Sequence, residues 1–160
     1  MANRTAWTPG NGAGITWTPL FGSEIVGLTG GATGGTVLSS VSVANGSALD
    51  QFMDVSIEAK IAANTIAAGA NFALWIMPLM EDGVTYGDNT VTTTPGTLVP
   101  GLFPAATLPL HPGGATGLYG YAQGIVLPPG TFACALQNNS GFGFTGATGT
   151  YRTYNQNLNN

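Results

Sequence analysis

Glycine and proline recur along the whole length of this chain. Its 160 residues include 25 glycines and 10 prolines, without the three-residue period of collagen. In a helix interior, glycine and proline cost about 1 and 3 kcal/mol relative to alanine, whereas both residues are common in turns. The composition therefore favours many short strands joined by turns, and no segment has a convincing helical pattern.

Charged side chains are almost absent. They make up 6% of the chain, where a soluble domain carries about 25%, and the formal net charge is −4. Nucleic-acid binding depends on clustered Lys and Arg, but the only basic residues here are Arg4, Lys60 and Arg152. We therefore expect neither nucleic acid nor an acidic membrane surface as a partner. A neutral exterior favours binding by packing over catalysis.

The chain also lacks the marks of secretion and membrane insertion. Its opening segment, MANRTAWTPG, has no apolar core of a signal peptide, and Cys134 is the only cysteine, so no internal disulfide can form. The longest apolar run, Phe72 to Met80, is far shorter than the roughly 20 residues of a spanning helix. We expect a protein made in the cytoplasm and not inserted in a membrane.

The first 34 residues resemble an extended arm more than a folded unit. Trp7 and Trp17 each precede a Thr-Pro pair, and the residue before a proline is pushed towards extended backbone. A glycine-rich stretch, 30–34, ends the segment. The sequence thus predicts an N-terminal arm over residues 1–34 and a single β-sandwich domain over residues 35–160.

Several segments of that domain have the patterns of strands. Residues 54–61 alternate without a break, with Val55, Ile57, Ala59 and Ile61 on one face, as in a half-buried strand. Weaker patterns cover residues 36–43 and 148–154, with Val37, Val41 and Val43 expected on one face of the first. The run 72–80 is apolar on both faces, so a second sheet and a loop, or a partner chain, should cover it on both sides.

The second half of the chain predicts one hairpin. Residues 118–127 and 131–138 are strand-like, and Pro129-Gly130 between them suits a type II turn. Residues 89–117, by contrast, carry a proline every few positions, which disfavours central strands. Seven or eight short strands result, so the expected fold is an all-β, single-domain antiparallel β-sandwich or jelly roll.

Few side chains suggest chemistry. His111, the only histidine, is expected in a loop, and Cys134, on the same strand face as Phe132 and Leu136, is expected to be a buried structural thiol. Glu81, Asp82 and Asp88 cluster near a turn; a solvated hairpin tip and a Ca²⁺ site are both open interpretations, and a glycosidase pair is disfavoured. The sequence predicts no catalytic residue, no metal and no cofactor.

Large aromatic residues are the main candidates for function. Tryptophan and tyrosine are enriched at interfaces, although they also serve as core residues. A third alternative is a sugar-binding face built from Trp7, Trp17, Tyr119, Tyr121, Tyr151 and Tyr154. The residues predicted to form a capsid or subunit interface are Trp7, Trp17, Phe21, Trp75, Phe103, Tyr151 and Tyr154.

Four stretches together resemble a known group of proteins. Residues 75–88, WIMPLMEDGVTYGD, are similar to an LLPS-x-DG-x-x-Y-x-DG stretch in small structural proteins of tailed bacteriophages. Residues 125–132, 136–141 and 151–155 resemble the C-terminal part of the same group. The likeness covers roughly residues 54–155. Proteins of this group are jelly-roll head decoration (cement) proteins on the outer capsid surface, often trimers.

The resemblance implies a virion structural protein that binds the major capsid protein, forms a homotrimer and is assembled in the host cytoplasm. A clamp of this kind needs no titratable site, in agreement with the composition. The alternative is a carbohydrate- or receptor-binding module of a phage particle, suggested by the aromatic residues of the second half. An enzyme that uses Glu81 and Asp82 is the third and least favoured hypothesis.

Overall fold

A computed structural model describes the protein at residues 4–8, 16–28, 35–61, 69–87, 91–97, 99–112 and 117–159, with the side chains of 4–8 and 156–159 left out. This part of the chain forms strands and one short 3₁₀ helix. The elements are β1 (Arg4–Thr8), β2 (Thr18–Phe21), η1 (Ser23–Gly27), β3 (Thr36–Leu38), β4 (Val43–Asn45), β5 (Phe52–Ile61), β6 (Asn71–Pro78), β7 (Ala106–Pro112), β8 (Gly117–Val126), β9 (Gly130–Asn139) and β10 (Phe144–Asn159).

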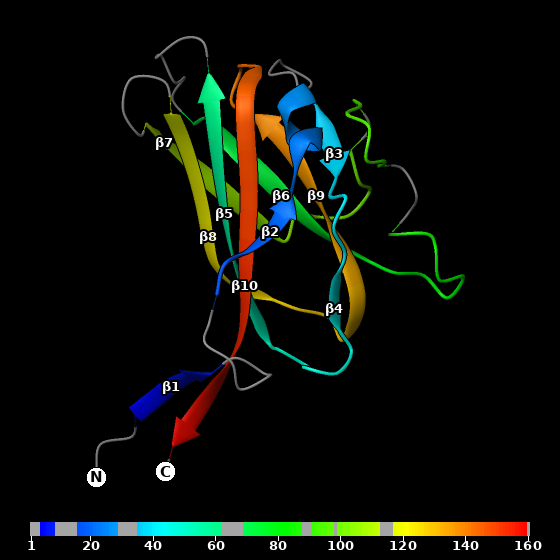
Figure 1. Ribbon diagram of the computed structural model, residues 1–160, viewed down its shortest axis with the longest axis vertical. Coiled ribbons are helices and arrows are strands. Elements are labelled where there is room, and N and C mark those ends of the chain that lie inside the picture. Colours follow the sequence, from blue (N-terminus) through cyan, green and yellow to red (C-terminus); the bar gives the residue numbers. More distant parts are fainter. Residues whose placement is uncertain are drawn as a thin grey trace.

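The strands follow one antiparallel path that folds over into two layers. The order is β1-β10-β5-β8-β7-β6-β9-β3, with β2 beside β10 and β4 beside β9. In Figure 1, β5, β8 and β10 form one layer, and β6 and β9 cross behind them. The predicted all-β sandwich is therefore confirmed.

The main core lies between the two layers. One layer contributes Val55, Ile57 and Ala59 from β5, as the alternation predicts, and the other contributes Phe72 and Leu74 from β6. The predicted face of β9, with Phe132, Cys134 and Leu136, is buried in the same core. Burying a side chain of this size stabilises the fold by about 1.5–3 kcal/mol.

Part of the predicted arm belongs to this core. Leu20, Phe21, Ile25 and Leu28 are at most 2% exposed and pack against the side chains of the sandwich. They lie on β2, on η1 and directly after η1, and both elements follow the edge of β10. The Glu24 carboxylate also ties η1 to the main body by accepting hydrogen bonds of 2.9 Å from both the N–H and the hydroxyl of Ser40.

The strand that is apolar on both faces is covered on both sides, as predicted. Phe72 and Leu74 of β6 face the main core, whereas Trp75 and Met77 face the other way. A second, smaller cluster covers that outer face, with Val91 and Tyr86 packed on Trp75 and Met77. The cover is the long connection between β6 and β7, so the domain supplies it without a partner chain.

The predicted hairpin of residues 118–127 and 131–138 is wrong. Both segments are strands, but β8 pairs with β5 and β7, and β9 pairs with β6, β3 and β4. The reason is burial: β9 is apolar on both faces and needs the doubly covered layer, whereas β8 leaves Tyr119 and Tyr121 exposed. The connection crosses between layers, and Gly130 has the predicted positive φ, +91°.

The proline-rich segment contains a central strand, contrary to prediction. Residues 106–109 of β7 pair with β6, and residues 110–112 pair with β8, so β7 joins the two layers. Pro109 lies at the last pair with β6, just before the strand changes partner. A missing backbone N–H is tolerated there because the ladder is interrupted in any case. His111 therefore lies on a strand, exposed and opposite Tyr119, and not in a loop.

Residues 36–43 form two short strands and not one. Leu38 is opposite Ala135 and Val43 is opposite Phe132, so extra residues bulge out between β3 and β4. The Ser39 hydroxyl stabilises the bulge by donating to the Val41 carbonyl (2.7 Å) and accepting from the Cys134 N–H (3.0 Å). Val37 and Val43 enter the core as predicted, but Val41 is only half-buried.

The last strand is longer than the predicted range of 148–154. It runs to Asn159, and its final residues pair with β1, with Arg4 opposite Asn159 and Thr8 opposite Asn155. This two-stranded ribbon of β1 and the end of β10 projects beyond the sandwich (Figure 1). The ribbon joins the first and last segments of the sequence.

Candidate functional site

A buried carboxylate organises one face of the sandwich. Asp54 lies on β5, on the side of the β5–β8–β10 layer that faces away from the core, yet it is only 2% exposed. It accepts hydrogen bonds from Tyr154 Oη (2.7 Å), Arg152 Nε (2.8 Å), the Gly124 N–H (3.0 Å) and Tyr121 Oη (3.3 Å). Arg152 Nη2 adds an ion pair of 2.7 Å.

These contacts keep the carboxylate ionised. Burial by itself raises the pKa of Asp54, but the hydrogen bonds from Tyr154, Gly124 and Arg152, together with the Arg152 charge, outweigh it, so the pKa is lowered. The same arrangement raises the pKa of Tyr154 to about 12, through burial and through its hydrogen bond to the anion. Asp54 is therefore a fixed negative charge that positions four neighbours, and not a proton carrier near neutral pH.

Aromatic rings surround this centre on the solvent side. Trp17 is 42% exposed, Tyr119 is 41% and Tyr121 is 38%. The ring centroids of Trp17 and Tyr121 are 6.2 Å apart, and the Arg152 guanidinium carbon lies 4.8 Å from the centroid of Trp17, within cation–π range. We call these three residues, Trp17, Tyr119 and Tyr121, the aromatic face.

A hollow adjoins the aromatic face. It has a volume of about 540 Å³, opens to solvent, and is lined by Ser23, Glu58, Lys60 and Thr148 among others. Glu58 connects the two features, because its Oε1 also accepts a hydrogen bond of 3.2 Å from Tyr119 Oη. Its negative charge raises the pKa of Tyr119.

A second exposed feature lies on the connection that covers the other layer. Val99, Leu102 and Phe103 are 41%, 58% and 96% exposed, and we call residues 99–104 the apolar loop. Trp75, buried beneath it, donates from Nε1 to the Leu102 carbonyl at 2.8 Å. The Ala105 N–H donates to the Leu74 carbonyl at 2.7 Å. The Leu102 carbonyl and, just after the loop, the Ala105 N–H are thus bonded to β6, while the side chains of Val99, Leu102 and Phe103 stay in solvent.

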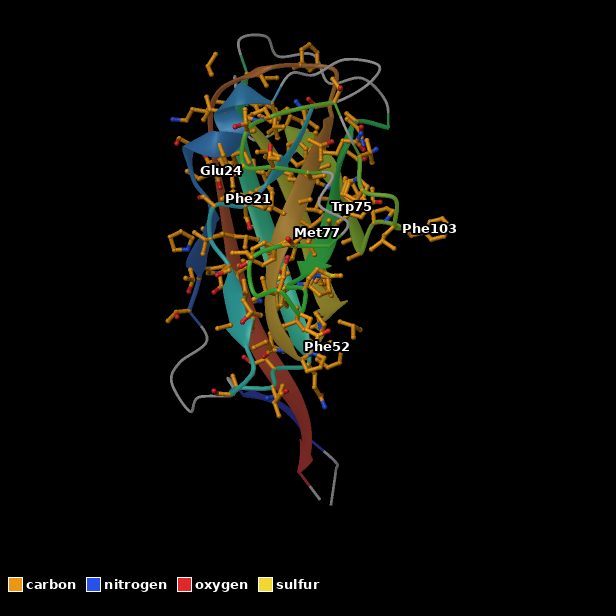
Figure 2. The ribbon with its side chains drawn as sticks, turned by 90° about the vertical axis from the view of Figure 1, so that its right-hand side faces the viewer. Phe21, Glu24, Phe52, Trp75, Met77 and Phe103 are labelled. Carbon is orange, nitrogen blue, oxygen red and sulfur yellow. The ribbon has the colours of Figure 1, made fainter. Side chains whose placement is uncertain are left out.

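Figure 2 shows how the two surfaces are separated. Phe103 projects away from the body of the molecule, beyond Trp75, whereas Phe21 and Glu24 lie at the opposite edge of the view. Glu24 belongs to η1, beside the hollow, which is lined by residues of η1, β5 and β10. The apolar loop and the aromatic face can therefore contact different ligands.

The residues predicted at an interface have different environments. Trp17 and Phe103 are exposed, and Tyr151 is half-buried. Phe21 (2% exposed), Trp75 (3%) and Tyr154 (5%) are buried within the domain. Trp7 lies opposite Gln156 in the terminal ribbon, but its side chain is outside the described residues. Of those whose side chains are described, Phe103 and Trp17 are the exposed ones, and they lie on separate surfaces.

Two of the titratable candidates have structural roles. Cys134 is fully buried, and burial raises its pKa to about 12, as expected for a structural thiol. Asp82 stabilises the predicted turn by accepting hydrogen bonds from the N–H groups of Val84 and Thr85. Hydrogen bonds from the Thr85 side chain and backbone, with that of Val84, lower its pKa. Asp88 lies outside the described residues.

Within the described ranges, no three His, Cys, Asp or Glu side chains gather closely enough to hold a metal ion. In the same ranges, no helix has the length and apolar character needed to cross a bilayer. Comparison of the chain with protein-family models, with curated proteins and with solved structures finds no match.

Sequence reasoning missed the pairing of Asp54 with Arg152. The alternation of residues 54–61 assigned only the four inward side chains, and Arg152 was counted only among the three basic residues. No local signal in the sequence identifies the pair. The partner itself could not be found, since it is distant in sequence and is set by the register of β5 against β10.

Proposed function

We propose that this chain is a virion structural protein of a tailed bacteriophage, which decorates the head and stabilises it by binding the major capsid protein. The observation that carries the proposal is the apolar loop, with Phe103 96% exposed above the Trp75 hydrogen bond. A large aromatic side chain left in water on a fixed support is typical of a surface that is covered in an assembly. The resemblance of residues 54–155 to decoration proteins supports the same role.

The apolar loop is suited to bind by burial. Burial of a phenylalanine side chain contributes about 1.5–3 kcal/mol, and Trp75 limits the conformational freedom that the loop loses on binding. Each contact is weak on its own. Many equivalent copies on one shell, joined as homotrimers, reach high avidity without a strong individual contact.

The terminal ribbon offers a second kind of contact. It is two-stranded where Thr8 pairs with Asn155 and Arg4 with Asn159, and an isolated two-stranded ribbon is marginally stable in water. A strand of a neighbouring subunit that pairs with its outer edge would stabilise it through main-chain hydrogen bonds. The proposed location is the outer capsid surface, reached after synthesis in the host cytoplasm, and the role requires no catalysis.

Co-sedimentation tests the role of the apolar loop. Capsids assembled from the major capsid protein of the same genome are mixed with the purified chain and pelleted. The wild-type chain should pellet with the capsids, and Phe103→Ser should bind at least about tenfold more weakly, because burial of this ring is lost. The matched control is Val84→Ser, since Val84 is 77% exposed on a different turn. Failure of the wild-type chain to bind, or equal loss in both variants, would refute the proposal.

A further inference from the structure

Two of the three rings of the aromatic face come from one strand. Tyr119 and Tyr121 are two residues apart on β8, so their side chains project from the same side of the layer. Trp17 immediately precedes β2, which pairs with the other edge of β10, and its ring lies beside that of Tyr121. Three exposed rings thus lie together over strands β5, β8 and β10.

Polar contacts fix each ring in place. Tyr121 Oη accepts from Gln123 Nε2 at 2.9 Å and donates to Asp54, while Tyr119 Oη donates to Glu58. The Trp17 ring lies over Arg152, whose guanidinium is in turn held by Asp54. The rings therefore lose little conformational freedom when a ligand covers them, which is the condition for a preformed site.

The charges around the aromatic face are balanced. Arg152 is neutralised by Asp54 at 2.7 Å. The adjoining hollow has one acidic and one basic side chain in its lining, Glu58 and Lys60. A phosphate or another polyanion would need an excess of positive charge. This balance therefore fits a neutral ligand.

The available groups define the ligand further. Exposed ring faces need apolar C–H surfaces to cover them, while the Gln123 amide, the Glu58 carboxylate, the Lys60 ammonium and the Thr148 hydroxyl need hydrogen-bonding partners. A sugar ring offers both, because its faces carry C–H groups and its rim carries hydroxyls. We propose that the aromatic face and the adjoining hollow form a binding site for a neutral saccharide chain, independent of the proposed capsid contact.

A glycan array with neutral and sulfated oligosaccharides tests this proposal, together with electrophoresis in gels that contain xylan, galactomannan or hydroxyethylcellulose. The wild-type chain should bind at least one neutral glycan and should be retarded by the corresponding polysaccharide. Trp17→Ala and Tyr119→Ala should weaken binding about three- to tenfold, the value of one aromatic contact. Tyr119→Phe keeps the ring and should therefore retain most of the glycan affinity.

Phe103→Ser is the matched control, because it removes an exposed ring from the apolar loop and should leave glycan binding unchanged. Circular dichroism confirms that each variant is folded. Absence of binding to every neutral glycan, binding of sulfated glycans alone, or equal weakening by Phe103→Ser would overturn the proposal. So would loss of capsid co-sedimentation in Tyr119→Ala without any glycan binding by the wild-type chain, because the face would then be a protein contact. Failure of the capsid proposal alone leaves these results unaffected.

Discussion

Replacement of Asp54 by Asn tests whether the buried carboxylate holds the β5–β8–β10 layer together. The substitution keeps the size of the side chain but removes its charge and replaces one acceptor oxygen with a donor NH₂ group. Asp54 is the acceptor in all four of its hydrogen bonds. An asparagine amide cannot accept them all, so some donors must lose their partner.

The magnitude follows from which donors lose their acceptor. The Tyr154 hydroxyl and the Gly124 N–H both donate to Oδ1 of Asp54, and the amide oxygen of asparagine can take that position. Arg152 Nε and the Tyr121 hydroxyl donate to Oδ2, where the NH₂ group of asparagine cannot accept them. A hydrogen bond to a charged group contributes about 1.5–3 kcal/mol, but the Arg152 side chain is 32% exposed and can turn towards water, which reduces its share of the loss. We expect Asp54→Asn to lower the free energy of unfolding by about 2 kcal/mol.

Denaturation by urea at neutral pH measures this loss. Glu58→Gln is the matched control, because Glu58 is on the same face of the same strand but bonds only to the exposed Tyr119 hydroxyl among the contacts described. An exposed contact of this kind contributes about 0–1 kcal/mol. Equal, small losses in both variants would show that Asp54 is a surface charge without a structural role.

The difference between wild type and Asp54→Asn should also depend on pH. The pKa of Asp54 is lower in the folded protein than its ordinary value of 3.8, so the folded state binds fewer protons than the unfolded state around and below that value. The contribution of the Asp54 carboxylate to the free energy of unfolding is therefore complete above about pH 4–5, and it is lost as the pH falls through the pKa of the folded state. A difference that grows on acidification would contradict the assigned ionisation.

Three further outcomes are expected. Gly149→Ala should lower the free energy of unfolding by about 1–3 kcal/mol, because an added Cβ would lie 2.7 Å from Phe21 Cδ2. Gly143 has open space around it, so Gly143→Ala should change the free energy of unfolding by less than about 1 kcal/mol. Similar urea midpoints for the two variants would contradict this expectation. Cys134 should react with a thiol reagent only as fast as the protein unfolds, since it is fully buried with a pKa of about 12. Rapid labelling of the native protein would contradict the burial of Cys134 in the core. Asn45→Ala should lower the free energy of unfolding by about 2–3 kcal/mol, measured by thermal or urea unfolding. The reason is that the Asn45 side-chain amide makes three hydrogen bonds to backbone groups of Asp50 and Pro128. A loss under about 0.5 kcal/mol would refute that role.

Local patterns were sufficient to predict β5 and β6. The alternation in residues 54–61 predicted which side chains of β5 face the core, and the two apolar faces of residues 72–80 predicted the double cover of β6. Both patterns depend on burial, which is expressed directly in the sequence. The positive φ of Gly130 was predicted from a different local signal, because a turn at that point favours glycine.

Pairing between strands was not predictable to the same extent. The segments that became β8 and β9 are separated by a turn-like Pro-Pro-Gly, which is equally compatible with a hairpin and with a crossing between layers. The choice depends on the partners already available to each strand. β7 was missed because the recurring prolines of residues 89–117 were taken to disfavour central strands, although the position of Pro109 at a change of partner makes it tolerable.

The candidate surfaces were only partly predictable. Phe103 and Trp17 were selected as aromatic residues, and the structure places both in solvent. Phe21, Trp75 and Tyr154 were selected on the same criterion but are buried, because residue type alone does not distinguish a core ring from an exposed one. Asp54 and Arg152 required the register of β5 against β10, which no local pattern encodes.

Electron cryomicroscopy of phage heads tests the central claim most directly. Particles from a strain with the gene intact are compared with particles from a strain that lacks it. We predict protrusions at symmetric positions of the wild-type head, into which the two-layered sandwich fits with the apolar loop against the shell, and their loss on deletion. Identical heads in the two strains, or density for the chain only in the tail, would contradict the claim.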